Sequence, residues 1–207
     1  PNTKYSTQDQ STVAWIEEAY SYGYYKGYSR NSVPWGEGTL IFNNGDKYAG
    51  EFMAGKFNGF GVFIGIDGSG YWGNWVNGKK SGAGKFYDGH LYEGSFSNGL
   101  KHGLGTYTFY EGEVITGEVE GAFANGEIDG YATFTIPGVS EYKGFWKSGK
   151  QEGKGTKTYD NGFAYTGDWI NDQMHGVGIM TIPYNKDFED KPMSYEGDMV
   201  SDEPNGH

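Results

Sequence analysis

Aromatic residues and glycines alternate with polar residues along most of this chain, with the period of two that side chains have on an extended strand. In Tyr48-Ala-Gly50-Glu-Phe52 the ring, the glycine and the second ring fall at alternate positions and so share one face. A second block, residues 59–63, alternates in the same way. The two blocks predict two β-strands. Interior glycines at this density disfavour helix, since each costs about 1 kcal/mol there.

The pair of blocks recurs along the chain, which is the sequence signature of a repeat protein. The first block returns at residues 71–75, 92–96, 142–146, 165–169 and 195–199, and a degenerate copy, Ile115-Thr-Gly117-Glu-Val119, fills the gap. A worn first copy starts at Tyr25. Two longer steps contain insertions, at 120–123 and 184–193. We expect an N-terminal segment over residues 1–24 and seven to eight units over 25–207, the last of them truncated.

Asn-Gly and Asp-Gly pairs separate the blocks, at 77–78, 98–99 and 125–126 within units and at 44–45, 67–68, 88–89 and 161–162 between them. Both residue types tolerate the positive φ that tight hairpin turns require. Each unit is therefore predicted to be a β-hairpin, and the chain an all-β protein in which successive hairpins form one long, single-layer antiparallel sheet.

A single layer can bury its aromatic rings only against its own backbone. Glycine leaves a gap that a neighbouring ring can fill, and burying such a ring is worth roughly 1.5–3 kcal/mol. The opposite face carries threonine and lysine, as expected of a solvated face. Apolar residues interrupt it at 60, 62, 64, 177 and 179, and these patches require a cover.

The N-terminal segment has a different pattern. Apolar residues at 13, 16, 19 and 20 follow Ser11 and Thr12, which is typical of a short helix behind a capping residue. Repeat arrays need caps at their ends. We therefore expect residues 5–22 to form a helical N-terminal cap, over the 60–64 patch.

The string Tyr-x-Gly-x-Trp/Phe-x-x-Gly-x-x-x-Gly-x-Gly resembles the MORN repeat (membrane occupation and recognition nexus) over about residues 25–206. His102 and His175 stand where MORN repeats often have histidine. The resemblance implies elongated, twisted sheets with one hairpin per repeat. It also implies a scaffold or adaptor that binds protein partners, self-associates or is linked to membranes. The fourth unit departs from the pattern, because it lacks its tyrosine and one glycine.

Composition narrows the possible partners. The 207 residues include 37 glycines and 18 % aromatic residues, and disordered chains lack this much apolar area. The net charge of −11 makes nucleic acid and anionic lipid poor partners, because Lys and Arg supply most of the affinity for them. There is no run of 18 apolar residues, no signal peptide and no glycosylation sequon, so we expect a cytoplasmic protein, either free or associated with the cytoskeleton or a membrane.

Signals of catalysis are scarce. The chain has no cysteine and no phosphate-binding loop motif, and its Gly-x-Gly strings open strands, whereas a dinucleotide site requires a helix there. The four histidines are too widely spaced for a zinc site. Carboxylates at Glu51, Glu93, Asp168, Glu196 and Asp198 fit either a solvated strand face or an acid–base pair. We predict a non-enzymatic protein without metal or cofactor.

The candidate partner-binding residues are the aromatic residues of the repeats. They either pack only on one another and on glycine, or they line a groove for an extended or helical peptide. Trp72 is out of phase and is expected to project from the other face. The set comprises Tyr48, Phe52, Tyr71, Trp72, Trp75, Tyr92, Phe96, Tyr142, Trp146, Tyr165 and Trp169.

Two classes of function follow from these residues. The first is a protein-binding scaffold whose acidic surface attracts a basic segment. The alternative is a surface-binding module for carbohydrate, cell wall or membrane lipid, although the charge disfavours lipid. The sequence stops within a unit, so we expect either a trimmed chain or a last strand that pairs with a second chain to give a homodimer. The mixed-charge insertion at 186–191 is expected to be a solvated loop or a partner contact.

Overall fold

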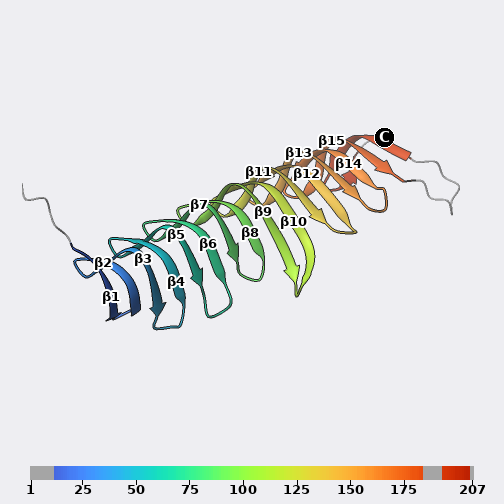
Figure 1. The fold of residues 1–207 in the computed structure, drawn as a ribbon. Coiled ribbons are helices and arrows are strands. Elements are labelled where there is room, and N and C mark those ends of the chain that lie inside the picture. Colours follow the sequence, from blue (N-terminus) through green and yellow to red (C-terminus); the bar gives the residue numbers. More distant parts are fainter. Residues whose placement is uncertain (1–11, 184–192, 206–207) are drawn as a thin grey trace, which may run out of the picture. The chain divides into compact units, whose positions relative to one another are not determined.

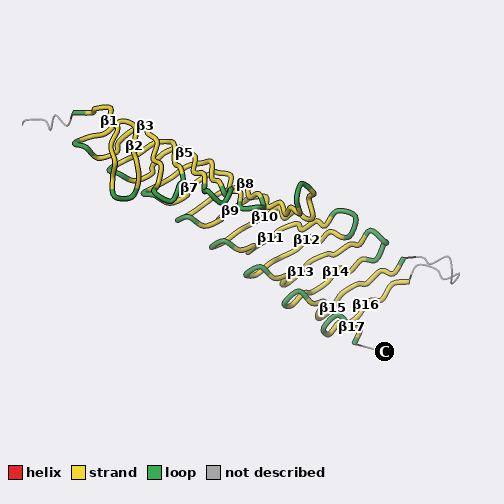
Figure 2. The backbone as a smooth tube through the Cα atoms, turned by 90° about the horizontal axis from the view of Figure 1, so that it is seen from below, coloured by secondary structure: helices red, strands yellow, loops and turns green. Residues whose placement is uncertain are grey.

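The computed structural model describes residues 12–183 and 193–205, which form seventeen β-strands and no helix (Figures 1 and 2). The chain divides into two compact units, residues 1–88 and 89–207. In each unit the strands follow one another as antiparallel hairpins, which confirms the predicted all-β class.

Unit 1 contains seven strands, each paired with the next along the chain. They are β1 (Val13–Tyr20), β2 (Gly23–Arg30), β3 (Val33–Phe42), β4 (Lys47–Met53), β5 (Lys56–Ile64), β6 (Gly70–Val76) and β7 (Lys79–Tyr87).

Unit 2 contains the other ten strands, again paired in chain order. They are β8 (Leu91–Ser97), β9 (Leu100–Glu111), β10 (Val114–Ala124), β11 (Glu127–Ile136), β12 (Ser140–Lys147), β13 (Lys150–Tyr159), β14 (Ala164–Ile170), β15 (Gln173–Ile182), β16 (Met193–Val200) and β17 (Glu203–Pro204). The loop expected at 186–191 lies outside the described residues.

The hairpin turns have the backbone conformation that their sequences predict. Asn77 and Gly78 have φ values of 52° and 80°, so both take the left-handed conformation of a tight turn. The Gly78 N–H donates to the Phe57 carbonyl oxygen of the preceding hairpin at 2.8 Å, and Gly126 donates to Lys101 in the same way at 2.9 Å. Each turn therefore also holds its hairpin against the one before it.

A bulge bends the second strand of each repeat hairpin from β2–β3 to β14–β15. Gly50 is opposite Gly61 and Phe52 is opposite Phe57, so a single residue on β4 faces three residues on β5. Gly59, in the middle of the three, has φ = 73°. The Glu51 carboxylate lies against Gly59, where a Cβ would be 2.5 Å from it.

The tyrosine of each repeat lies across a pair of glycines. A Cβ on Gly61 would be 2.2 Å from Tyr48 Oη, so only glycine fits beneath this ring. Tyr48 Oη donates to the Glu51 carbonyl oxygen at 2.9 Å, which satisfies the buried hydroxyl. Equivalent bonds are made by Tyr71, Tyr92, Tyr142, Tyr165 and Tyr195 to the carbonyl three residues later.

The second aromatic residue of each repeat joins neighbouring hairpins. The Trp169 ring lies 5.3 Å from Tyr165 of its own repeat and 5.2 Å from Tyr142 of the preceding one, both edge to face. Its Nε1 donates to the Gly155 carbonyl oxygen at 3.1 Å. Each hairpin thus covers the tyrosine of its neighbour, and we call the face on which these rings lie the ladder face.

The predicted N-terminal helix is wrong. Of the segment in question, residues 13–20 form β1, which pairs with β2 along its whole length, and residues 1–11 lie outside the described part of the chain. The Glu17–Lys26 ion pair (2.7 Å) and the Trp15–Tyr28 ring contact (5.2 Å) join the two strands. These residues form a strand although their apolar positions have a helical spacing, because β2 offers a full ladder of backbone hydrogen bonds. The 60–64 patch consequently has no helical lid, and Phe60 stays 56 % exposed.

The degenerate fourth copy begins at Val119 and not, as predicted, at Ile115. Val119 and Phe123 are 1 % and 4 % exposed, whereas Ile115 is 47 % exposed. Val119-Glu-Gly121-Ala-Phe123 is therefore the true copy, with valine in place of tyrosine. Gly121 is opposite Ala132, which stands where other repeats have their second glycine. A valine is smaller than a tyrosine ring, so it leaves room for the Ala132 methyl group.

Candidate binding face opposite the aromatic ladder

The structure buries ten of the eleven predicted contact residues. The ladder side chains Tyr48, Phe52, Tyr71, Trp75, Tyr92, Phe96, Tyr142, Trp146, Tyr165 and Trp169 are between 0 and 7 % exposed. They pack on one another and on glycine, so they leave almost no surface for a partner to touch. Trp72 lies on the opposite face, as expected, and is 40 % exposed.

Burial changes the acidity of the ladder tyrosines. It raises the pKa of Tyr25, Tyr71 and Tyr92 to about 12, because the phenolate would have to lose its hydration. The pKa of Tyr48 and that of Tyr142 are also raised, mainly by burial. These hydroxyls are neutral structural donors near neutral pH.

On the face opposite the ladder, the accessible side chains belong to residues that directly precede or follow a buried glycine in the sequence. Because Gly59 forms the bulge and Gly61 lies under a tyrosine ring, the residue between them, Phe60, must project to the opposite side. The residue after the first-block glycine, such as Glu51, does the same. We call this side the groove face. Its central Gly-x-Gly residues are Glu37, Phe60, Ala83, Leu104, Lys154 and Val177, together with Tyr131, which lies between Gly130 and Ala132.

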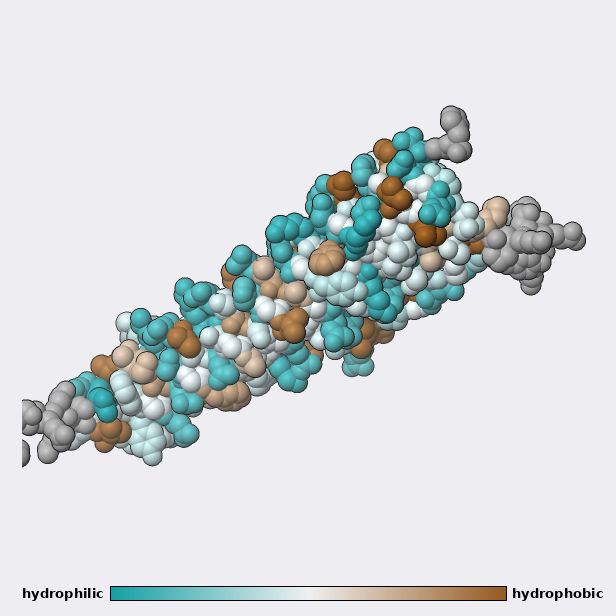
Figure 3. Space-filling model, turned by 90° about the horizontal axis from the view of Figure 1, so that it is seen from above, coloured by the Kyte–Doolittle hydropathy of each residue, from teal (hydrophilic) through white to brown (hydrophobic). Residues whose placement is uncertain are grey.

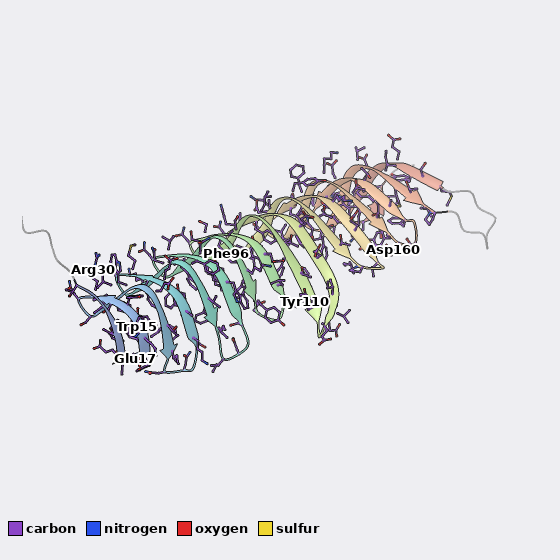
Figure 4. The ribbon with its side chains drawn as sticks, viewed as in Figure 1. Trp15, Glu17, Arg30, Phe96, Tyr110 and Asp160 are labelled. Carbon is purple, nitrogen blue, oxygen red and sulfur yellow. The ribbon has the colours of Figure 1, made fainter. Side chains whose placement is uncertain are left out.

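Unit 1 has a hollow of 580 Å³ on its groove face. Gly38 and Gly50 form part of its lining, together with Trp15, Lys26, Glu37, Thr39, Glu51 and Phe60. Trp15 and Glu17 both extend from β1 (Figure 4). Trp15, from the segment expected to be a helix, and Phe60, from the patch that required a cover, thus line the same hollow.

Unit 2 has two hollows of the same kind, of 720 and 430 Å³. Tyr131 lines both, and Phe145 lines the smaller one. Their rings are 5.6 Å apart, edge to face, and are 56 % and 52 % exposed. Leu104 and Val177, at 73 % and 58 %, add further exposed apolar surface to these hollows.

Apart from the exposed Glu196, the charged side chains that line the smaller hollow are paired within the protein. Lys154 Nζ lies 2.8 Å from an Asp168 carboxylate oxygen, and Lys143 Nζ lies 2.6 Å from Glu141. The hydroxyls of Thr156 and Thr166 share a 3.0 Å hydrogen bond. What this hollow offers a ligand is therefore chiefly its apolar surface. Figure 3 shows how hydrophobic residues lie in small groups among hydrophilic ones on the surface it displays.

Two of the carboxylates considered for acid–base chemistry, Glu51 and Asp168, have structural partners. Glu51 Oε1 accepts the Phe60 N–H at 2.9 Å, and Asp168 pairs with Lys154. The His175 carbonyl oxygen accepts a bond from Tyr165 Oη at 3.3 Å. Within residues 12–183 and 193–205 there is no group of three acidic or histidine side chains that could hold a metal ion, and no helix that could cross a bilayer.

The sequence contains a signal for this face in the alternation of its strands. Strand alternation places the central Gly-x-Gly residue opposite the ladder, so Glu37 and Tyr131 could have been named as accessible. Their neighbours in the hollows could not be predicted, because Trp15 and Phe60 are 45 positions apart in the chain and line one hollow only through the pairing of five strands.

Comparison with known families gives seven matches to one family model, described as MORN repeat. They cover residues 25–47, 48–70, 71–89, 92–114, 120–138, 142–163 and 165–183. The fifth match begins at residue 120, beside the Val119 copy that the structure reveals. A search of curated proteins found no match.

Proposed function

Because this chain belongs to the MORN-repeat family, we propose that it is a non-enzymatic scaffold that binds protein partners through its groove face. MORN repeats suggest a repeat-protein scaffold, and such repeats commonly bind proteins or membranes. We add to this that the partner is a protein and that it binds on the groove face.

The observation that supports it is the distribution of exposed aromatic residues. The ladder rings are needed to hold the hairpins together, yet Trp15, Phe60, Tyr131 and Phe145 are each more than half exposed on the groove face. They contribute little to the core. Aromatic side chains are enriched in protein interfaces, where they supply contact area at a low entropic cost.

The lining of the larger hollow of unit 2 combines apolar and acidic side chains, since Leu104 and Tyr131 lie there together with Glu93 and Glu120. The excess of acidic residues favours a partner segment with positive charge.

Affinity capture from the cells that express the protein, read by cross-linking mass spectrometry, tests the proposal. We expect Tyr131→Ser/Phe145→Ser to lose the captured partner and its cross-links, since both rings are exposed and the fold does not depend on them. Val114→Ser/Leu100→Ser is the matched control, because these residues are 65 % and 49 % exposed at hairpin ends. Circular dichroism checks that both variants fold.

A partner that binds the double serine variant as well as the wild type would contradict the proposal. So would binding of anionic vesicles at moderate salt, or of a glycan, in place of protein. Self-association through the C-terminal repeats stays a prediction, and light scattering of the pure protein measures it.

A further inference from the structure

We propose that the hollow of unit 1 binds an arginine side chain from a basic segment of a protein partner. The inference rests on the proposed function and specifies the chemistry of one site on the groove face. It is drawn from two acidic side chains that face each other between aromatic rings.

Glu37 on β3 and Glu51 on β4 are directly opposite each other in the strand register, and both line the hollow. Both residues are exposed. Like charges directly opposite on adjacent strands destabilise a sheet. Among the described residues, neither carboxylate takes part in an ion pair, and Glu51 only accepts the Phe60 N–H. The pair therefore lacks a counter-charge that a ligand could provide.

The one cation lining the hollow is already engaged. Lys26 Nζ lies 2.7 Å from Glu17 Oε1, and Tyr24 Oη donates to Glu17 Oε2 at 2.9 Å. These contacts lower the pKa of Glu17 and raise that of Lys26, so both groups stay charged and paired near neutral pH. The hollow is thus left with the two uncompensated charges of Glu37 and Glu51.

Aromatic rings flank the acidic pair. Across the strands from β1 to β5 the order is Trp15, Tyr28, Glu37, Glu51 and Phe60. Trp15 and Tyr28 meet edge to face at 5.2 Å, and Trp15 is 53 % exposed. A cation between such rings gains about 0.5–1 kcal/mol at an exposed site.

These groups suit arginine better than lysine or a metal ion. The guanidinium is planar, so it can stack on a ring while its forked donors reach two carboxylates. An ammonium group is a compact, strongly hydrated point charge and gains less from the rings. The 580 Å³ of the hollow exceed the volume of one such side chain.

Fluorescence polarisation with a labelled octa-arginine peptide at physiological salt tests the site, with octalysine and octacitrulline as control peptides. We expect Glu37→Gln/Glu51→Gln to weaken octa-arginine binding about tenfold, which corresponds to about 1.4 kcal/mol. Glutamine keeps an acceptor for the Phe60 N–H, so the bulge is preserved. Glu111→Gln/Glu113→Gln removes the same charge from an exposed hairpin end and should change the affinity less than about twofold.

Trp15→Ala supplies a second variant whose charge is unchanged. We expect it to weaken octa-arginine binding about two- to fivefold and octalysine binding less. Octacitrulline, which has the shape but not the charge, should not bind. Equal affinity of the two glutamine pairs, or equal binding of octa-arginine and octalysine, would overturn the arginine site.

Failure here is distinguishable from failure of the proposed function. A captured partner that depends on Tyr131 and Phe145 but not on Glu37 and Glu51 leaves the scaffold function intact and removes the arginine site. Specific octa-arginine binding without any protein partner that depends on the groove face would support the arginine site and contradict the scaffold function.

Discussion

The packing of a tyrosine ring over glycine can be tested at Tyr142 and Gly155 in unit 2. A Cβ on Gly155 would lie 2.3 Å from Tyr142 Oη and 2.6 Å from Cζ. Neither distance is possible without displacing the ring. We expect Gly155→Ala to cost about 1–3 kcal/mol through overpacking, reduced by about 0.4–1 kcal/mol because alanine restricts the unfolded chain.

Tyr142→Val removes a ring that is 1 % exposed and packs edge to face on Trp146 and Trp169 at 5.3 and 5.2 Å. It also removes the 3.1 Å hydrogen bond to the Phe145 carbonyl oxygen. We expect it to lower the free energy of unfolding by roughly 2–4 kcal/mol. The double variant copies the Val119 and Ala132 pair that the protein already contains, in which the alanine methyl occupies the space of the absent ring.

The two changes should therefore compensate each other. We expect the double variant to be about 1–2 kcal/mol more stable than the sum of the single effects, within the usual range for contacting residues. Urea unfolding followed by far-UV circular dichroism and by tryptophan fluorescence measures all four proteins. Additivity within about 0.5 kcal/mol, or a Gly155→Ala variant as stable as the wild type, would refute the idea that this glycine exists to accommodate the ring.

Two further predictions concern the same core. The pKa of Tyr25, Tyr71 and Tyr92 is raised to about 12 in the folded protein, so the stability they provide is complete below about pH 10 and is lost as the pH rises toward 12. Absorbance at 295 nm during an alkaline titration should show these groups ionising together with unfolding, and ionisation near pH 10 in a folded protein would contradict their burial. Trp75→Ala should lower the free energy of unfolding by about 3–5 kcal/mol in a urea titration, whereas Trp72→Ala, on the groove face, should cost less than about 1.5 kcal/mol. Equal costs would contradict the assignment of the two faces.

Local chemistry made most of the fold predictable. Period-two alternation and Asn-Gly turns act within a few residues, so the sequence places both strands and their hairpin turn, as at Asn98 and Gly99. The fourth unit shows the limit of this reasoning. Gly117 and Gly121 lie on the same side of an alternating strand, so the alternation alone does not tell which of them belongs to the repeat. In the structure Gly121 is the one opposite β11 in the core, because the β9–β10 hairpin is longer.

The N-terminal strand was unpredictable for another reason. Its apolar residues fit a helical spacing, but the free energy of β1 comes from hydrogen bonds to β2, which a reading of residues 13–20 alone does not include. The same applies to the binding face. The placement of Trp15 and Phe60 in one hollow, and of Glu37 opposite Glu51, depends on the strand register and on the bulges, and the sequence shows neither directly.

In each repeat the ladder face packs the hairpins together, whereas the groove face is free to vary. The same repeat can therefore carry different side-chain chemistry in the two units. The ladder requires tyrosine, glycine and a second large apolar residue, so these positions cannot change without a compensating change, as at Val119 and Ala132. The central Gly-x-Gly residue makes no such contact and is Glu37, Phe60, Tyr131 or Lys154 in different repeats. Unit 1 therefore presents an acidic pair between aromatic rings, while the smaller hollow of unit 2 is largely apolar and its two lysines are paired with Asp168 and Glu141. Under the proposed function, partner selection would depend on residues whose replacement leaves the sheet intact, and a groove-face variant that unfolds the protein would show that the two roles are not separate.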